Sequence, residues 1–84
     1  MTLQQLEYFV SAAHNLNFSK TAEMFFVSQS AITQQIRSLE KELKLDLFIR
    51  KNNRISLTDS GQVFMREAEQ ILAKTGISED IRVK

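Results

Sequence analysis

The sequence predicts a mainly α domain, a winged helix-turn-helix with a three-helix core, a short two-stranded β wing and a long C-terminal helix. The first observation behind it is that apolar residues recur every three or four positions before residue 44 and after residue 58. Between these segments the period changes to two, and a pair of asparagines interrupts it. The third observation is that residues 28–40 divide into one apolar and one polar helical face.

Size and composition limit the protein to one small globular domain. The 84 residues, of which 43% are hydrophobic, suffice for a single core. No stretch approaches the roughly 20 apolar residues that a membrane span requires. The absence of cysteine excludes disulfides and thiolate-based zinc sites. The first 26 residues lack the basic start and apolar run of a secretory signal, so we expect a cytoplasmic protein without membrane contact.

Two amphipathic helices are expected in the first 27 residues. Leu3, Leu6 and Phe9 begin a helical pattern that runs to about residue 14, where the turn-prone segment 15–17 ends it. Ser19 is a good N-cap for a second, short helix. The apolar positions of this helix, which should face the core, are Ala22, Phe25 and Phe26.

The third helix has the chemistry of a surface that reads bases. Ser28 can cap this helix, which runs to about Leu43. Its polar face carries hydroxyls, amides and a guanidinium, with no acid before Glu40, and such groups match the donor and acceptor pattern of the DNA major groove. With the preceding helix it forms a helix-turn-helix over about residues 18–39. The residues expected to contact DNA from this helix are Ser28, Gln29, Ser30, Thr33, Gln34 and Arg37.

A β-hairpin is expected next, with limits of about 46–58. Apolar and polar residues alternate on both sides of Asn52-Asn53, a pair typical of a tight hairpin turn. Residues 27–58 hold six Lys and Arg against three acids, so positive charge is concentrated here although the net charge of the chain is only +1. We expect this wing to contact DNA through Arg50, Lys51, Asn52, Asn53 and Arg54, although exposed cations also blunt strand edges in many proteins.

A long helix follows the wing, and Thr58 is its expected N-cap. Its apolar face is wider than so small a body can cover, which indicates a partner helix and hence a homodimer. The chain is thus divided into a DNA-binding domain, residues 1–58, and a linker or dimerisation helix with its tail, residues 59–84, in which Gly76 interrupts the helix. The residues expected to dimerise are Val63, Phe64, Glu67, Ala68, Ile71 and Leu72.

The sequence indicates no enzyme. It has no nucleophile and base pattern, no metal-ligand spacing and no Gly-rich phosphate loop, so no catalytic residue, metal or cofactor is expected. His14 has no second ligand near it and is expected to be structural. The six Phe are expected mostly in the core rather than as stacking platforms for single-stranded nucleic acid, whereas Tyr8 is expected to face solvent.

Two classes of function remain open at this point. The first is sequence-specific binding of double-stranded DNA by a dimer, with the third helix in the major groove and the wing at the minor groove. The second is a winged helix that docks a partner protein through the same polar face and binds no nucleic acid. DNA binding that saturates and discriminates between sequences would separate the two.

A connected series of residues resembles the N-terminal winged helix-turn-helix domain of LysR-type transcriptional regulators. The resemblance covers residues 3 to about 72. The run Phe18-Ser19-Lys20-Thr21-Ala22 resembles the start of the family's second helix, and residues 27–36 resemble its recognition helix. The series continues with Leu39-Glu40, Leu43, Leu47-Phe48, Arg50 and Leu57-Thr58 with Gly61.

The resemblance implies a bacterial transcription factor that binds duplex DNA as a homodimer, often assembled further into a tetramer. It also implies a separate C-terminal domain that senses a small-molecule inducer and is absent from this chain. In that family the residues matching Gln29, Ser30, Thr33 and Gln34 face bases, the one matching Arg37 contacts the backbone, and wing cations approach the minor groove.

Three positions depart from the family pattern. Lys44 stands where the family usually has Gly, so a different end of the third helix is expected. Gln34 stands where many members have Arg, which favours adenine over guanine as its target. Asn53 occupies a position that is often basic, which shifts the expected minor-groove contact to Arg54.

Overall fold

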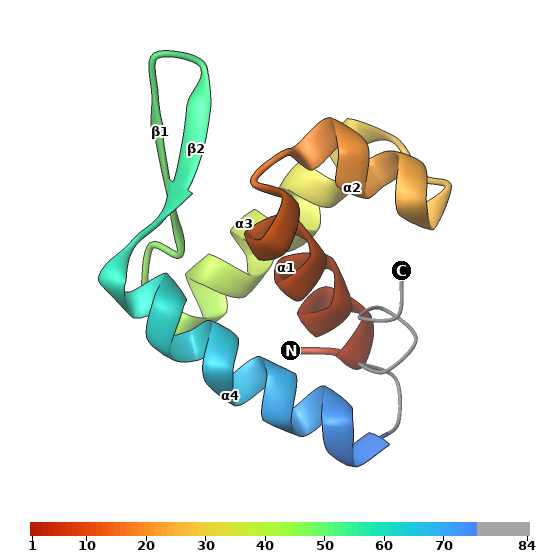
Figure 1. Ribbon diagram of the computed structural model, residues 1–84, viewed down its shortest axis with the longest axis vertical. Coiled ribbons are helices and arrows are strands. Elements are labelled where there is room, and N and C mark those ends of the chain that lie inside the picture. The colour runs from red at the N-terminus through yellow and green to blue at the C-terminus, as the bar shows by residue number, and fades with distance from the viewer. Residues whose placement is uncertain (76–84) are drawn as a thin grey trace.

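The computed structural model describes residues 1–75 and contains, within them, four helices and one β-hairpin (Figure 1). The predicted interruption at Gly76 and the tail lie outside the described residues. The mainly α architecture with a two-stranded wing confirms the expected fold. In order, the elements are α1 Leu3–Asn15, α2 Phe18–Phe25, α3 Gln29–Leu43, β1 Phe48–Lys51, β2 Arg54–Leu57 and α4 Asp59–Thr75.

Helix α1 is the centre of the body and is held at both ends by local hydrogen bonds. Thr2 and Gln5 form a reciprocal capping box, and Leu16 closes the other end in a left-handed conformation with φ 50°. The helix packs against α2, α3 and α4, so more than one of its faces is buried. Tyr8 is therefore only 5% exposed and meets Phe25 edge to face at 4.9 Å, which corrects the expectation that it faces solvent.

Helix α2 begins and ends differently from the prediction. Its N-cap is Asn17, whose side chain accepts a hydrogen bond from the Lys20 N–H, and Ser19 lies inside the helix. At the other end Phe26 takes a left-handed conformation with φ 57° and is 95% exposed, so it does not point at the core as expected. A residue in that conformation ends the helix and turns its own side chain away from the helix axis.

Helix α3 begins as predicted, because Ser28 accepts a hydrogen bond from the Ala31 N–H at 3.1 Å. It ends at Leu43 with Lys44 in the left-handed region at φ 57°, and the Leu45 N–H returns to the Glu40 carbonyl. This is the closure that the family usually builds with Gly. The expectation of a different helix end was therefore wrong, and Lys44 carries a backbone strain of roughly 1 kcal/mol.

The core is built around the ring of Phe9, which is fully buried. Phe48 from the hairpin and Phe64 from α4 contact it with ring centroids 5.6 Å and 5.4 Å away. Phe18 at the start of α2 meets Phe48 edge to face at 5.2 Å. Aromatic residues from four elements thus fix the wing and α4 to the helical body.

The hairpin projects from the helical body (Figure 1). Its strands are antiparallel, with Phe48 opposite Leu57 and Lys51 opposite Arg54. Asn52 and Asn53 form the two-residue turn, both with positive φ, as a type I′ hairpin requires. The predicted turn is therefore confirmed.

Thr58 connects the hairpin to α4. Its hydroxyl donates to the Asp46 carbonyl and accepts a hydrogen bond from the Gly61 N–H at 2.8 Å, so it caps α4 as predicted. Gly61 lies so close to the segment before β1 that an added Cβ would overlap the Leu47 carbonyl oxygen. The absence of a side chain at this position allows α4 to start directly beneath the wing.

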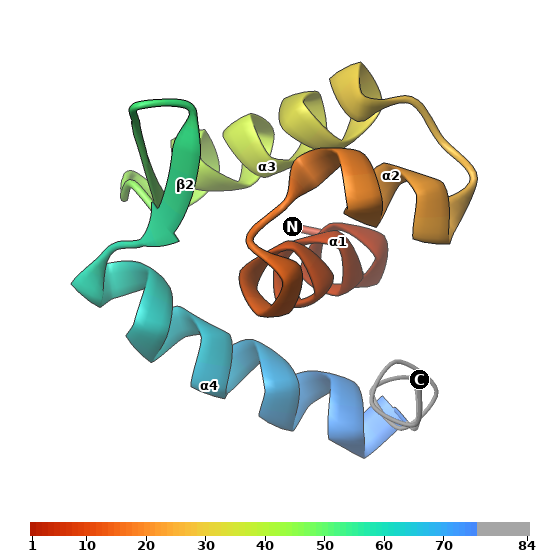
Figure 2. The same cartoon turned by 45° about the horizontal axis from the view of Figure 1, so that its top comes forward.

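Helix α4 lies on the opposite side of α1 from α3 (Figure 2), and the stripe predicted to dimerise divides into two on it. Phe64, Ala68 and Leu72, spaced four residues apart, are buried in the domain's own core. Ala68 and Leu72 are fully buried and therefore not available to a partner, which corrects their assignment, whereas Phe64 is 9% exposed and lines a groove with Val63 and Glu67. Val63, Glu67 and Ile71 form a second stripe with the same spacing and are exposed.

Candidate nucleic-acid interface

The polar face of α3 forms one continuous exposed surface. Ser28, Gln29, Ser30, Gln34 and Arg37 are exposed, and Thr33 is half-buried. Side chains of five of these six predicted residues line a shallow groove along the helix: Gln29, Ser30, Thr33, Gln34 and Arg37. The buried side of the same helix consists of Ile32, Ile36 and Leu39, which anchor it in the core. The structure therefore brings these five polar side chains together on the solvent side.

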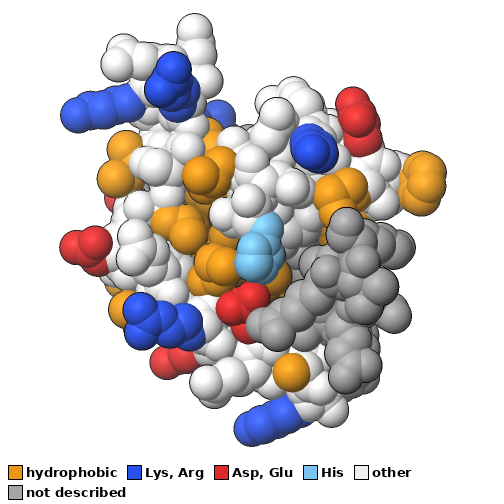
Figure 3. All heavy atoms as spheres, viewed as in Figure 1, with side chains coloured by type: hydrophobic (Ala, Val, Ile, Leu, Met, Phe, Trp, Pro, Cys, Tyr) orange, Lys and Arg blue, Asp and Glu red, His pale blue; other side chains and the backbone are white. Residues whose placement is uncertain are grey.

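The wing presents cations that have no anionic partner within residues 1–75. Arg50, Lys51 and Arg54 are exposed, and the two ion pairs of the described structure lie elsewhere, at Met1–Glu42 and His14–Glu69. Lys51 and Arg54 are direct cross-strand neighbours, an arrangement that destabilises a hairpin by like-charge repulsion. Figure 3 shows these basic side chains gathered on the projecting hairpin. An external anion such as phosphate would relieve the repulsion.

A second groove lies between the wing and the start of α2 and includes the first residue of α3. The residues that line it are Leu16, Asn17, Phe18, Ser19, Gln29, Arg50, Lys51, Asn52, Asn53, Arg54 and Ile55. Gln29 lines both grooves, so the two surfaces are continuous at this side chain. All five predicted wing residues therefore line one groove together with Gln29, the first residue of α3.

The base of the wing is attached to α2 by Arg50. Its guanidinium carbon lies 5.0 Å from the centroid of the Phe18 ring, a cation–π distance. Since Phe18 also contacts Phe48, the first strand is held at two points against α2. Arg50 therefore has a packing role in addition to its charge, whereas Lys51 and Arg54 lie nearer the tip.

The model of the family "bacterial regulatory helix-turn-helix protein, lysR family" matches residues 3–62. The chain belongs to the LysR family. This confirms the resemblance inferred from the residues, and the matched span includes α1, α2, α3 and the whole wing.

Curated relatives of this LysR-family chain are transcriptional regulators. It is 46% identical over 72 residues to the "Probable RuBisCO transcriptional regulator" of Phaeodactylum tricornutum, covering 86% of this chain and 24% of the relative. It is 44% identical over 72 residues to the "HTH-type transcriptional regulator CitR" of Bacillus subtilis, covering 86% of this chain and 25% of the relative. The chain thus spans about a quarter of the length of the curated relatives it matches.

Solved structures with the same fold include two that contain DNA. The CbnR DNA-binding domain in complex with DNA is 36% identical with a TM-score of 0.86, covering 98% of this chain and 94% of that one. The BenM DNA-binding domain in complex with catB site 1 DNA is 30% identical with a TM-score of 0.86, covering 90% of this chain and 82% of that one. These comparisons agree with the winged helix-turn-helix described above.

Five residues that line the groove beside the wing were not predicted as site residues: Leu16, Asn17, Phe18, Ser19 and Ile55. Asn17, Phe18 and Ser19, at the start of α2, line the groove beside the wing, and Ser19 bonds the side chain of Gln29. A signal was present, because the family resemblance included the Phe18-Ser19 pair. The proximity of the start of α2 to the start of α3 is a tertiary contact, however, and could not be predicted from the sequence.

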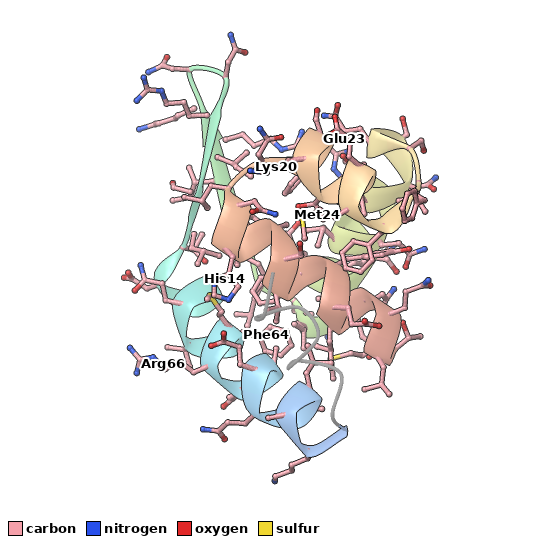
Figure 4. All side chains as sticks on the ribbon, turned by 45° about the vertical axis from the view of Figure 1, so that its right-hand side comes forward. His14, Lys20, Glu23, Met24, Phe64 and Arg66 are labelled. Atoms are coloured by element: carbon pink, nitrogen blue, oxygen red, sulfur yellow. The ribbon has the colours of Figure 1, made fainter. Side chains whose placement is uncertain are left out.

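The described residues contain no group of His, Asp and Glu able to hold a metal ion. His14, the only histidine, lies between α1 and α4, where its Nε2 is 3.0 Å from Glu69 Oε2 (Figure 4). This contact joins α1 to α4. Within residues 1–75, no helix is long and apolar enough to cross a bilayer.

Proposed function

We propose that this chain is the DNA-reading part of a bacterial transcriptional regulator and binds double-stranded DNA in a sequence-specific manner. In this proposal α3 enters the major groove with Gln29, Ser30, Thr33 and Gln34 toward the bases. Arg37 contacts the backbone, and the wing reaches the adjacent minor groove. The observation that carries the proposal is the continuity of the two grooves, which joins a polar helix face to unpaired cations.

The charges and donors fit this partner better than a protein partner. Amide and hydroxyl groups on one helix face match base edges, and each good bidentate pair discriminates by about 1–3 kcal/mol. Lys51 and Arg54 at the wing tip repel each other, and binding to DNA phosphates would relieve this repulsion. Such phosphate contacts supply most of the sequence-independent affinity for DNA. The relatives' names and the two DNA complexes of similar chains support the same partner.

We further propose that the chain pairs with a second copy through the exposed stripe of α4, Val63, Glu67 and Ile71. Val63 is 57% exposed and Ile71 37% exposed, and on one stripe of the helix they form an apolar surface that a partner helix can cover. Val63 and Glu67 also line a groove together with Leu45, which is itself 43% exposed. A two-fold pair predicts near-palindromic half-sites about one helical turn, roughly 34 Å, apart or a multiple of this distance.

The test is selection of bound duplexes from a randomised library, followed by gel shifts of selected and scrambled duplexes at two salt concentrations. The proposal expects an enriched near-palindromic motif, saturable binding, and affinity that falls steeply with salt. A protein-docking module would enrich no motif and would bind selected and scrambled duplexes equally. That outcome would end the proposal.

A further inference from the structure

The first residue of the recognition helix is held by a side chain from the preceding helix. The Ser19 hydroxyl donates a hydrogen bond to the Gln29 amide oxygen, with Oγ and Oε1 2.8 Å apart. Ser19 is in the first turn of α2 and Gln29 is the first residue of α3, so the bond connects the N-terminal ends of the two helices. Both side chains are exposed and both line the groove beside the wing.

This bond fixes which end of the Gln29 amide faces outward. A glutamine amide has an acceptor oxygen and a donor NH2 group, and in free solution it can present either to a ligand. Here the oxygen accepts a hydrogen bond from Ser19 and is turned toward α2, and Nε2 has no hydrogen-bond partner among residues 1–75. Both remaining N–H groups are therefore available on the exposed side.

We propose that Ser19 is a positioning residue that makes Gln29 a donor toward DNA, so that Gln29 selects a base edge made of acceptors. Guanine presents N7 and O6 acceptors side by side in the major groove, whereas adenine pairs an N7 acceptor with an N6 donor. The usual bidentate contact of glutamine with adenine needs the amide oxygen and the NH2 group side by side toward the base, whereas the bond to Ser19 turns this oxygen toward α2. With its oxygen bonded to Ser19, Gln29 favours guanine.

The inference rests on the proposed function and extends it to one base position. It also distinguishes the two exposed glutamines of α3, Gln29 and Gln34, because no protein side chain among the described residues bonds Gln34. Gln34 keeps both its donor and its acceptor for a base, as the adenine contact requires. The two exposed glutamines of α3, Gln29 and Gln34, thus read different bases because of one hydroxyl from α2.

The experiment is selection from a randomised duplex library with the 84-residue chain and its variants. Gln29→Ala first identifies the position whose preference depends on Gln29. The native chain should prefer guanine there over adenine by about tenfold. Ser19→Ala should lower this ratio several-fold, toward equal use of the two bases, because the freed amide can turn. Ser19→Thr retains the hydroxyl and should restore the preference.

Ser38→Ala is the matched control, since Ser38 is an exposed serine of α3 outside both grooves. Circular dichroism establishes that each variant is folded. The inference is overturned if the native chain prefers adenine at the Gln29-dependent position. It is also overturned if Ser19→Ala weakens all sequences equally with the base profile unchanged, which would make Ser19 a backbone contact only. Failure of the native chain to enrich any motif would instead overturn the proposed function itself.

Discussion

The carboxylate of Glu40 accepts a hydrogen bond from the Leu47 backbone N–H at 2.7 Å, and its Oε2 also accepts one from the next residue, Phe48, at 3.2 Å. Glu40 belongs to α3, and Leu47 immediately precedes β1. One side chain of the polar helix thus fixes the base of the wing. The distance between α3 and the wing, the two surfaces proposed to enter the DNA grooves, depends on this contact.

Glu40→Gln should destabilise the domain by about 1 kcal/mol, because a neutral amide oxygen replaces a charged acceptor. Glu40→Ala, which leaves both N–H groups without this partner, should cost more, about 1–3 kcal/mol. Urea unfolding monitored by circular dichroism measures both changes. Glu42→Gln is the control, as Glu42 is exposed and contacts only the N-terminal amine. Equal stability of Glu40→Ala and the native chain would refute a structural role for this carboxylate.

Lys44→Gly should stabilise the domain by roughly 1 kcal/mol. Lys44 holds a left-handed conformation that is strained for a residue with a Cβ, and Gly removes that strain, although it adds entropy to the unfolded chain. Lys44→Ala is the matched control because it removes the charge and keeps the strain. The readout is the midpoint of thermal unfolding. If Ala and Gly shifted the midpoint equally, the charge and not the backbone would be responsible.

Gly61→Ala should destabilise the domain by about 1–3 kcal/mol, the usual cost of inserting a methyl group into a packed contact. The added Cβ would overlap a backbone carbonyl, that of Leu47, which cannot rotate away as a side chain can. Gln62→Ala tests the adjacent exposed position, where no such overlap is present. Thermal unfolding of the two variants gives the comparison. A Gly61→Ala protein as stable as Gln62→Ala would mean that α4 moves freely relative to the wing.

Substitutions in α3 and in the wing should weaken DNA binding in different ways. Thr33→Ala should relax the preference at particular bases by about 1–3 kcal/mol. Arg54→Ala should weaken all sequences and lower the salt slope by about one unit. Binding titrations with a selected duplex and single-base variants, at several salt concentrations, distinguish the two patterns. Lys41→Ala, an exposed cation at the far end of α3, is the control. A uniform loss with Thr33→Ala would rule out base reading by that side chain.

Ile71→Glu should convert a dimer into a folded monomer, because it replaces an apolar residue of the proposed partner surface with a second negative charge one turn from Glu67. Leu72→Ala, one residue on, should instead lower the stability of each domain by about 2–5 kcal/mol, since Leu72 is fully buried in it. Light scattering gives the mass and circular dichroism the folding of both variants. Gln70→Glu, at an exposed neighbouring position, is the charge control. Detection of an unchanged dimer with Ile71→Glu would exclude this stripe as the interface.

Features fixed by short-range chemistry could be predicted from the sequence. The cap at Ser28 depends on a backbone N–H three residues away, and the Asn52-Asn53 turn needs only two residues that tolerate positive φ. The alternation of α3 between packed and polar positions is likewise a property of one helix. The cap, the turn and the two faces of α3 were therefore predicted correctly.

Features that depend on neighbours in space could not be predicted. Apolar periodicity assumes one buried face, but α1 is covered by three helices, and Tyr8 is buried outside that face. Apolar periodicity on α4 also could not show that Phe64 is buried in the core whereas the neighbouring Val63 is exposed. Ser19 and Asn17 are both good caps, and the left-handed Leu16 before them selects Asn17.

Helix α4 has two parallel edges, one embedded in its own domain through Phe64, Ala68 and Leu72 and one open to solvent. If two copies pair along the exposed edge, each domain is held rigidly at the dimer interface, because residues 59–72 belong to one continuous helix. The spacing between the two half-sites that such a dimer can bind is then set by how closely the two α4 helices pack, rather than by any residue that contacts a base.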